Sequence, residues 1–232
     1  MQRNGNQEDR TGADTVPPVS SDRIGNAKDR VDLYGFLAKL LKTPPNLELV
    51  RGLRQTDFVS MAASKREEGA TDIASALEEV SGYFVNAAEK PEKEVQQDLA
   101  VDWTRLFRGV SPNYGPPPPY EAVYNQTHLA LPELLMKILS SYHEGGVTVE
   151  KDTANRPDYM GVEFEYLQFL GEHEIEDLKQ GDQEEANRYR ECAAQFLEDH
   201  LGQWAGPFCD KAIPMAQTGF FLGVLHLIKA VA

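Results

Sequence analysis

Two short stretches of this sequence place carboxylates next to aromatic rings, beside residues that interrupt regular helix. The first, residues 106–124, reads LFRGVSPNYGPPPPYEAVY, and its four consecutive prolines favour a stiff polyproline II segment before Tyr120, Glu121 and Tyr124. The second, residues 156–170, reads RPDYMGVEFEYLQFL and has Asp158 near its start. A rigid edge with one ring and one carboxylate is suited to a ligand that is both cationic and apolar.

Both stretches also have a plain structural interpretation. The prolines suit a stiff connector between two helices. Asp158 stands where a helix N-cap belongs, with Pro157 directly before it, and a cap needs no further role. The residue types alone leave these alternatives open.

Motifs for catalysis or metal binding are missing from the sequence. No histidine follows a glutamate by three residues, as helical di-metal sites require, and HExxH is absent. The two cysteines, Cys192 and Cys209, form no CxxC pair and are expected to be small buried hydrophobes. Phosphate-loop, dinucleotide and nucleophile-elbow motifs are absent as well. We therefore expect no catalytic residue, no metal and no cofactor. A helical metal-dependent enzyme that uses the acidic and histidine residues of 158–177 remains the alternative.

The charge balance excludes several classes of partner. The net charge is −14, which argues against nucleic-acid binding and against docking on anionic lipid. Residues 161–200 hold twelve acidic and three basic side chains, so their field attracts a basic partner. The most apolar segment, residues 213–232, is interrupted by polar residues and predicts a buried helix without stable membrane insertion. The amino terminus has no secretory signal, so a cytoplasmic location is expected.

The pattern of apolar residues predicts an all-α protein with a single helical domain, residues 27–232, after a disordered tail, residues 1–26. Apolar spacings of three and four recur from Lys28 onward, and no alternating pattern is long enough for a strand. The predicted helices span about 28–43, 47–58, 71–90, 91–107, 120–143, 159–179, 183–201, 206–215 and 217–230. Gly202 is expected to end the helix over 183–201 as a C-terminal cap.

Three motifs in order resemble the TorD/DmsD family of redox-enzyme maturation chaperones. The resemblance covers roughly residues 28–231. An aromatic-x-x-Leu-Phe helix end appears as Trp103 to Phe107, and Pro-Tyr-Glu-Ser appears as Pro119-Tyr120-Glu121-Ala122. Pro-Asp-His appears as Pro157-Asp158-Tyr159, and Phe-Leu-x-x-His-Leu-x-x-Trp appears as residues 196–204. The sequence departs from the family pattern where Tyr159 replaces the histidine and Ala122 replaces the serine.

The resemblance implies a non-catalytic chaperone for the catalytic subunit of a molybdopterin oxidoreductase. Such a protein binds the client's twin-arginine leader and body until the cofactor is inserted. The implied leader site is a groove between residues 116–124 and the helix after Asp158, on a monomer or dimer. Asp158 and Glu121 are expected to attract the arginines, and aromatic rings to pack the apolar part. The full set of candidate binding residues is Trp103, Phe107, Pro119, Tyr120, Glu121, Tyr124, Pro157, Asp158, Tyr159 and Glu163. A plain interaction subunit without chaperone activity is a further hypothesis.

Overall fold

The computed structural model describes residues 21–109, 114–124, 129–148 and 156–232. Most of the expected tail, residues 1–20, lies outside this part of the chain. Residues 21–26, which the sequence assigned to the tail, form the first turns of a helix. This helix therefore begins seven residues before its expected start at Lys28.

The described residues are almost entirely helical and form no strand, which confirms the all-α prediction. The α-helices are α1 (Ser21–Lys42), α2 (Leu47–Gln55), α3 (Phe58–Glu67), α4 (Thr71–Asn86), α5 (Glu92–Phe107), α6 (Glu121–Tyr124), α7 (Leu131–Glu144), α8 (Met160–Gln180), α9 (Gln183–Phe196), α10 (Gly202–Ala212) and α11 (Gly219–Val231). A π-helical turn, Leu197–Leu201, joins α9 to α10, and a 3-10 turn, Ile213–Met215, follows α10.

Local chemistry explains where several helices begin and end. Asn46 and Asp57 cap α2 and α3, because each side chain accepts a hydrogen bond from the backbone N–H three residues later. The helix predicted over 47–58 therefore ends at Gln55, and α3 is a further helix that the sequence did not predict. Gly181 ends α8 in the left-handed conformation, with φ of 83°, and Asp182 then caps α9. These signals fix the tight reversal that lays α9 back along α8.

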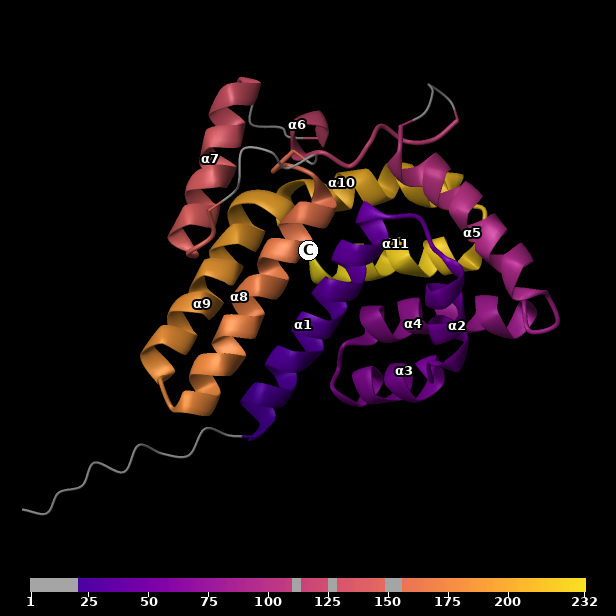
Figure 1. Ribbon diagram of the computed structural model, residues 1–232, viewed down its shortest axis with the longest axis horizontal. Helices are drawn as coiled ribbons and strands as arrows, with labels where there is room; N and C mark the ends of the chain where they lie inside the picture. Colours follow the sequence, from indigo (N-terminus) through magenta and orange to yellow (C-terminus); the bar gives the residue numbers. More distant parts are fainter. Residues whose placement is uncertain (1–20, 110–113, 125–128, 149–155) are drawn as a thin grey trace, which may run out of the picture.

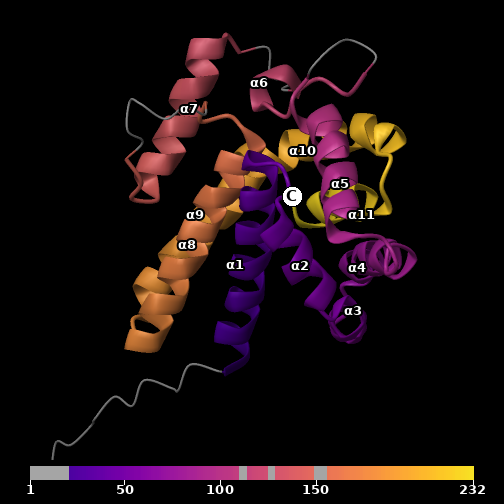
Figure 2. The same ribbon diagram turned by 45° about the vertical axis from the view of Figure 1, so that its right-hand side comes forward.

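Helix α1 is the central element of the arrangement. In both views it lies between the α8–α9 pair on one side and α2–α4 on the other (Figures 1 and 2). Its closest packing is along α8, while α4 packs against α3 and α11. Helix α11 crosses behind α1 and is buried on most of its surface, as the sequence predicted for the segment over 213–232.

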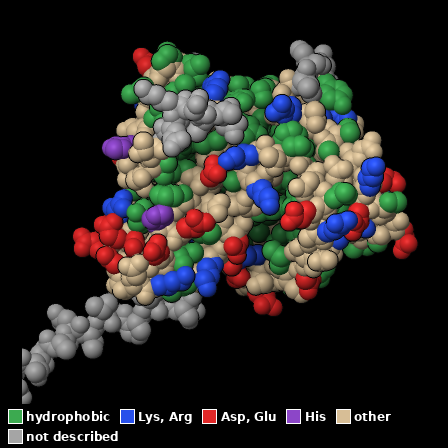
Figure 3. Space-filling model, in the orientation of Figure 1, with side chains coloured by type: hydrophobic (Ala, Val, Ile, Leu, Met, Phe, Trp, Pro, Cys, Tyr) green, Lys and Arg blue, Asp and Glu red, His purple; other side chains and the backbone are tan. Residues whose placement is uncertain are grey.

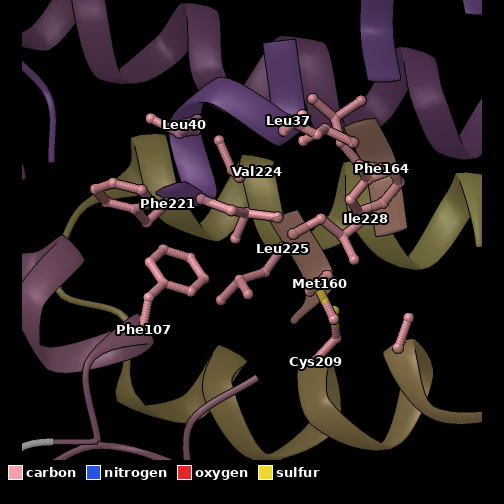
Figure 4. Packing of buried hydrophobic residues seen from close by; sticks show 14 of the residues in the cluster. Leu37, Leu40, Phe107, Met160, Phe164, Cys209, Phe221, Val224, Leu225 and Ile228 are labelled. Atoms are coloured by element: carbon pink, nitrogen blue, oxygen red, sulfur yellow. The ribbon is translucent and has the colours of Figure 1, made fainter. Parts of the chain in front are cut away.

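The hydrophobic core forms where α1, α5, α8, α10 and α11 meet. Figure 4 shows Leu37, Phe164, Phe221 and Val224 packed in this core, together with Cys209. Cys209 is fully buried and Cys192 is half-buried, and both are free thiols. Their expected role as small apolar side chains fits these positions. Among the described residues, no helix is long and apolar enough to span a membrane.

The helix predicted over 120–143 is not continuous, because α6 ends at Tyr124 and α7 begins at Leu131, and the boundary predicted at Gly202 is wrong as well. Gly202 does not end the helix, because the chain passes through the π turn and continues directly into α10. Gly202 has right-handed helical dihedrals, with φ of −65° and ψ of −21°. A Cβ atom there would lie 2.5 Å from the carbonyl oxygen of Leu197. A glycine is therefore needed at position 202, because the carbonyl group of Leu197 lies too close for a side chain.

Candidate functional site

The two stretches that the sequence singled out lie side by side. Tyr120 and Tyr159 form an isolated antiparallel bridge. The backbone N–H of Glu121 donates to the carbonyl of Asp158 over 2.8 Å, and Met160 donates to Pro119 over 3.1 Å. The proline-rich segment is already extended, so it pairs with the residues just before α8 without losing helical hydrogen bonds.

The side chain of Asp158 is fully buried at this junction. Arg156 donates to both of its carboxylate oxygens, to Oδ1 over 2.8 Å from Nε and to Oδ2 from Nη2. The backbone N–H of Ala122 donates to Oδ2 over 3.3 Å. Asp158 does not cap its own helix, because the N-cap position of α8 is Tyr159, which makes no capping hydrogen bond. Its carboxylate instead binds the first turn of α6.

A second buried carboxylate, Glu121, pairs with a histidine from the π turn. Nδ1 of His200 lies 3.2 Å from Oε2 of Glu121, and both side chains are about 4% exposed. On the other side of the ring, Nε2 lies 3.1 Å from Oγ of Ser141. This hydroxyl donates to the carbonyl of Lys137 over 3.3 Å, so it accepts from Nε2. The imidazole ring thus lies between a carboxylate on one side and a hydroxyl on the other, and each of its nitrogens is within hydrogen-bond distance of one of them.

The third buried acid, Glu163, lies in the first turn of α8. The indole Nε1 of Trp204 donates to its Oε2 over 3.1 Å. Burial, and next the negative charge of Glu121, raise the pKa of Glu163 well above its ordinary value. Its Oε1 has no hydrogen-bond partner in the described structure. The raised pKa favours the neutral form of this acid, which lies beside the Glu121–His200 pair.

Most of the predicted aromatic residues belong to the core. Trp103, Phe107 and Tyr124 are only 3%, 2% and 6% exposed. The indole of Trp103 donates to the carbonyl of Leu40, and Tyr124 stacks on Trp204 with ring centroids 5.9 Å apart. These rings pack in the core beneath the site, and a ligand cannot reach them in this structure.

Two tyrosines occupy the front of the site. Tyr159 is buried, and its hydroxyl donates to the carbonyl of Leu41 at the end of α1. Burial raises its pKa well above the ordinary tyrosine value. Tyr120 is partly exposed, and the guanidinium of Arg156 lies over its ring at 4.8 Å from the centroid. Tyr120 and Arg156 together form the accessible surface above Asp158.

Sequence reasoning gave no site role to Arg156, His200 or Trp204. The signal for the last two was present, since the His-Leu-x-x-Trp part of the third motif spaces them four residues apart on one helix face. The π turn that directs His200 toward Glu121 has no comparable signature. Arg156 stands two residues before Asp158 and pairs with it. The pairing depends on the backbone conformation between them, which the sequence does not give.

An apolar cavity of about 410 Å³ opens elsewhere, between α1, α3, α4 and α11. Figure 3 looks onto this face, where hydrophobic side chains line a hollow between α1 and the α3–α4 pair. Lys65 of α3 crosses the rim to bind Asp29 of α1, and it also binds Glu68 over 2.8 Å. Asp32 lies on the same rim. The apolar lining consists of Leu33, Phe36, Leu53, Phe58, Met61, Ile73, Leu77, Val80 and Leu227.

The acidic and histidine residues of 158–177 do not assemble as a metal site. Nδ1 of His173 lies 3.0 Å from the carbonyl of Phe169 in its own helix, and the ring packs against Phe169 and Tyr189. Within the described parts of the chain, no group of three His, Cys, Asp or Glu side chains is placed to hold a metal ion. The geometry gives no support to the metal-dependent alternative.

Comparison with known proteins gives one family. The family model described as nitrate reductase delta subunit matches residues 39–210, about three quarters of the chain. This range includes every residue of the paired stretches and of the buried acid cluster. Searches of curated proteins and of solved structures give no significant match.

Proposed function

Because the chain belongs to the nitrate reductase delta subunit family, a redox-enzyme maturation chaperone family of the TorD type, we propose that it is a cytoplasmic chaperone for one molybdoenzyme catalytic subunit. In this proposal it binds the client's twin-arginine leader and its body, and it releases the client after molybdopterin insertion. The family match agrees with the resemblance to the TorD/DmsD family, in that both give a maturation chaperone of the TorD type. The observation that carries the proposal is the pairing of Pro119–Glu121 with Asp158–Met160, which gathers the candidate recognition residues at one place.

The basic part of the leader is assigned to Tyr120 and to the carboxylate of Asp158, which Arg156 covers in this structure. A carboxylate accepts two parallel hydrogen bonds from a guanidinium, and a ring beside it adds a cation–π contact. Arg156 already makes both contacts with these two residues. The arrangement therefore has the chemistry that an arginine requires. Glu121 supports it from below, since its carboxylate is turned to His200.

The apolar part of the leader is assigned to the cavity between α1 and the α3–α4 pair. The cavity has the volume of a ligand pocket and a mostly apolar lining, as in grooves that bind amphipathic helices. Its described lining carries Asp29 and Asp32 against one cation, Lys65, and Lys65 is also paired with Glu68, so negative charge is in excess there. This charge favours an apolar segment with basic flanks over an acidic one.

Calorimetry with a synthetic leader tests the proposal. The peptide carries a twin-arginine motif followed by an apolar segment, and a control peptide has both arginines replaced by glutamine. Wild-type protein is expected to bind the first peptide, more weakly as salt is raised, and to bind the control at least tenfold more weakly. Equal affinity for the two peptides would exclude recognition of the arginines.

The site is tested in the same assay with Asp158→Asn. This change removes the charge and nearly conserves the shape, and loss of one charged contact is expected to weaken binding about ten- to a hundredfold. Asp210→Asn is the matched control, because Asp210 is an exposed acid on α10 that pairs only with Lys229 among the described residues. Unchanged binding by Asp158→Asn, with the fold intact, would remove Asp158 from the leader site.

A deletion strain tests the biological role. Loss of the protein is expected to leave the client without its molybdenum cofactor, and Asp158→Asn should restore less activity than wild type. A client that matures normally in the deletion strain would favour a plain interaction subunit. Stoichiometric zinc or iron in protein purified without added metal would favour the enzyme alternative.

A further inference from the structure

Arg156 binds to its own chain in the way a foreign arginine would bind. Its guanidinium donates to both carboxylate oxygens of Asp158 and lies 4.8 Å from the centroid of the Tyr120 ring. The carboxylate is fully buried, whereas the side chain of Arg156 remains 43% exposed. The pair thus has a fixed acceptor inside the protein and a donor that reaches it from the solvent side.

The two partners differ in how firmly the rest of the structure holds them. Asp158 is fixed by the bond from the N–H of Ala122 and by its backbone pairing with Glu121. The guanidinium of Arg156 has no other hydrogen-bond acceptor among the described residues. Its displacement therefore moves one side chain and leaves the paired backbone in place. The acceptor, unlike the donor, is preorganised.

We propose that Asp158 and Tyr120 form a guanidinium-binding subsite that Arg156 fills in the free protein and that an arginine of the client fills in the complex. This inference rests on the proposed function, and adds to it an internal competitor. An attached competitor acts at an effective concentration near the millimolar range. The apparent affinity for the client equals the intrinsic affinity multiplied by the fraction of time that the subsite is free, so occupancy by Arg156 weakens client binding. A peptide without arginine therefore does not displace Arg156 and does not occupy this subsite.

The competition predicts that removal of Arg156 tightens leader binding. Arg156→Gln is expected to bind the synthetic leader about tenfold more tightly than wild type, mainly through faster association with an open subsite. Arg156→Lys keeps the charge but loses the planar fork, and it should also bind more tightly than wild type. Arg188→Gln is the matched control, because Arg188 pairs with Glu185 and lies 4.3 Å from the centroid of the Tyr189 ring on α9. It should bind the leader as wild type does.

A second measurement needs no leader. In Arg156→Ala the subsite is empty, so dilute guanidinium chloride should raise its Tm by about 2–4 °C relative to sodium chloride at equal ionic strength. Wild type, Arg188→Ala and the double variant Arg156→Ala/Asp158→Asn should show no such rise. If Arg156→Ala does not fold, Arg156→Lys replaces it in this test.

The outcomes distinguish failure of the guanidinium subsite from failure of the proposed function. If wild type does not bind the leader but guanidinium stabilises Arg156→Ala, the subsite stands and the proposed function fails. If wild type binds the leader and Arg156→Gln binds it equally or less tightly, the internal competitor is excluded. The absence of any guanidinium effect on the folded Arg156→Ala or Arg156→Lys variant would overturn the subsite.

Discussion

Nδ1 of His200 lies 3.2 Å from a carboxylate oxygen of Glu121, and the two side chains are buried together although 79 residues separate them in the sequence. The pair joins the short helix α6 to the π turn before α10. Asp158 accepts a hydrogen bond from the first turn of the same helix. The two contacts together hold α6, and with it Tyr120 directly before it, in position.

Breaking the buried pair is expected to be costly. Glu121→Gln leaves His200 without its charged partner inside the protein and should lower the free energy of unfolding by about 1–3 kcal/mol. The matched control is Glu79→Gln, since Glu79 pairs with His226 over 2.6 Å but both side chains are 36% exposed. There the loss should stay below about 1 kcal/mol. Urea denaturation measures both, and equal losses would show that burial does not strengthen the first pair.

The protonated state of Glu163 is expected to give the protein a pH-dependent stability. Burial and the charge of Glu121 raise its pKa in the folded state, whereas the unfolded chain ionises near the ordinary value. Stability from this group is therefore complete below the unfolded pKa and is lost as pH rises toward the folded pKa, by at most ~1.4 kcal/mol per unit. Glu163→Gln keeps a neutral group and should abolish this decline. Denaturation at several pH values between 5 and 8 tests it, and parallel curves for variant and wild type would contradict the neutral acid.

The π turn depends on a glycine, and a glycine in α2 supplies the comparison. Gly202→Ala places a Cβ atom 2.5 Å from the carbonyl oxygen of Leu197, so the turn must shift and His200 with it. We expect a loss of about 1–3 kcal/mol, in the range of strained core substitutions. Gly52→Ala, in α2, meets nothing within 4 Å and should stabilise that helix by about 0.5–1 kcal/mol. Thermal unfolding distinguishes them, and a neutral Gly202→Ala would mean that the turn adapts at little cost.

The apolar cavity is tested by two positions on α3. Met61 lines the cavity and is 46% exposed, so Met61→Glu should leave the fold intact and weaken leader binding about tenfold or more. Val59, two residues away and 65% exposed, does not line the cavity. Val59→Glu adds the same charge to the same helix, and its leader affinity should remain near wild type. Calorimetry with equal losses in both variants would point to charge alone and against occupancy of the cavity.

The sequence was informative wherever one local rule decides the structure. Proline and the spacing of apolar residues predicted the all-α class and the order of the main helices. The proline-rich stretch and the residues around Asp158 were singled out because they interrupt that pattern, and the structure brings them together. Local rules misjudged Gly202, because a glycine that ends a helix and one that permits a close carbonyl look alike in a sequence.

The partners of each carboxylate could not be predicted in the same way. Asp158 looked like the cap of its own helix, yet it binds Arg156 and the first turn of a helix 36 residues earlier in the chain. Glu121 and Glu163 were expected among the residues that bind the leader, but α6, α8 and α10 enclose them with His200 and Trp204. Such pairings depend on the packing of distant helices. No spacing in the sequence encodes them before the fold is known.

The single bridge between Tyr120 and Tyr159 also bears on the order of folding. Its two sides are far apart in the chain, and closing so long a loop loses much chain entropy and returns only a few hydrogen bonds. The hairpin of α8 and α9, which is local, has no such barrier. We therefore expect the bridge to form last and to open first, as a small unit of its own that exchanges its amide protons before the core does. In the proposed leader site the paired edge is what presents Tyr120 and Asp158, so we expect a chain whose helices are folded but whose bridge is open to bind no leader.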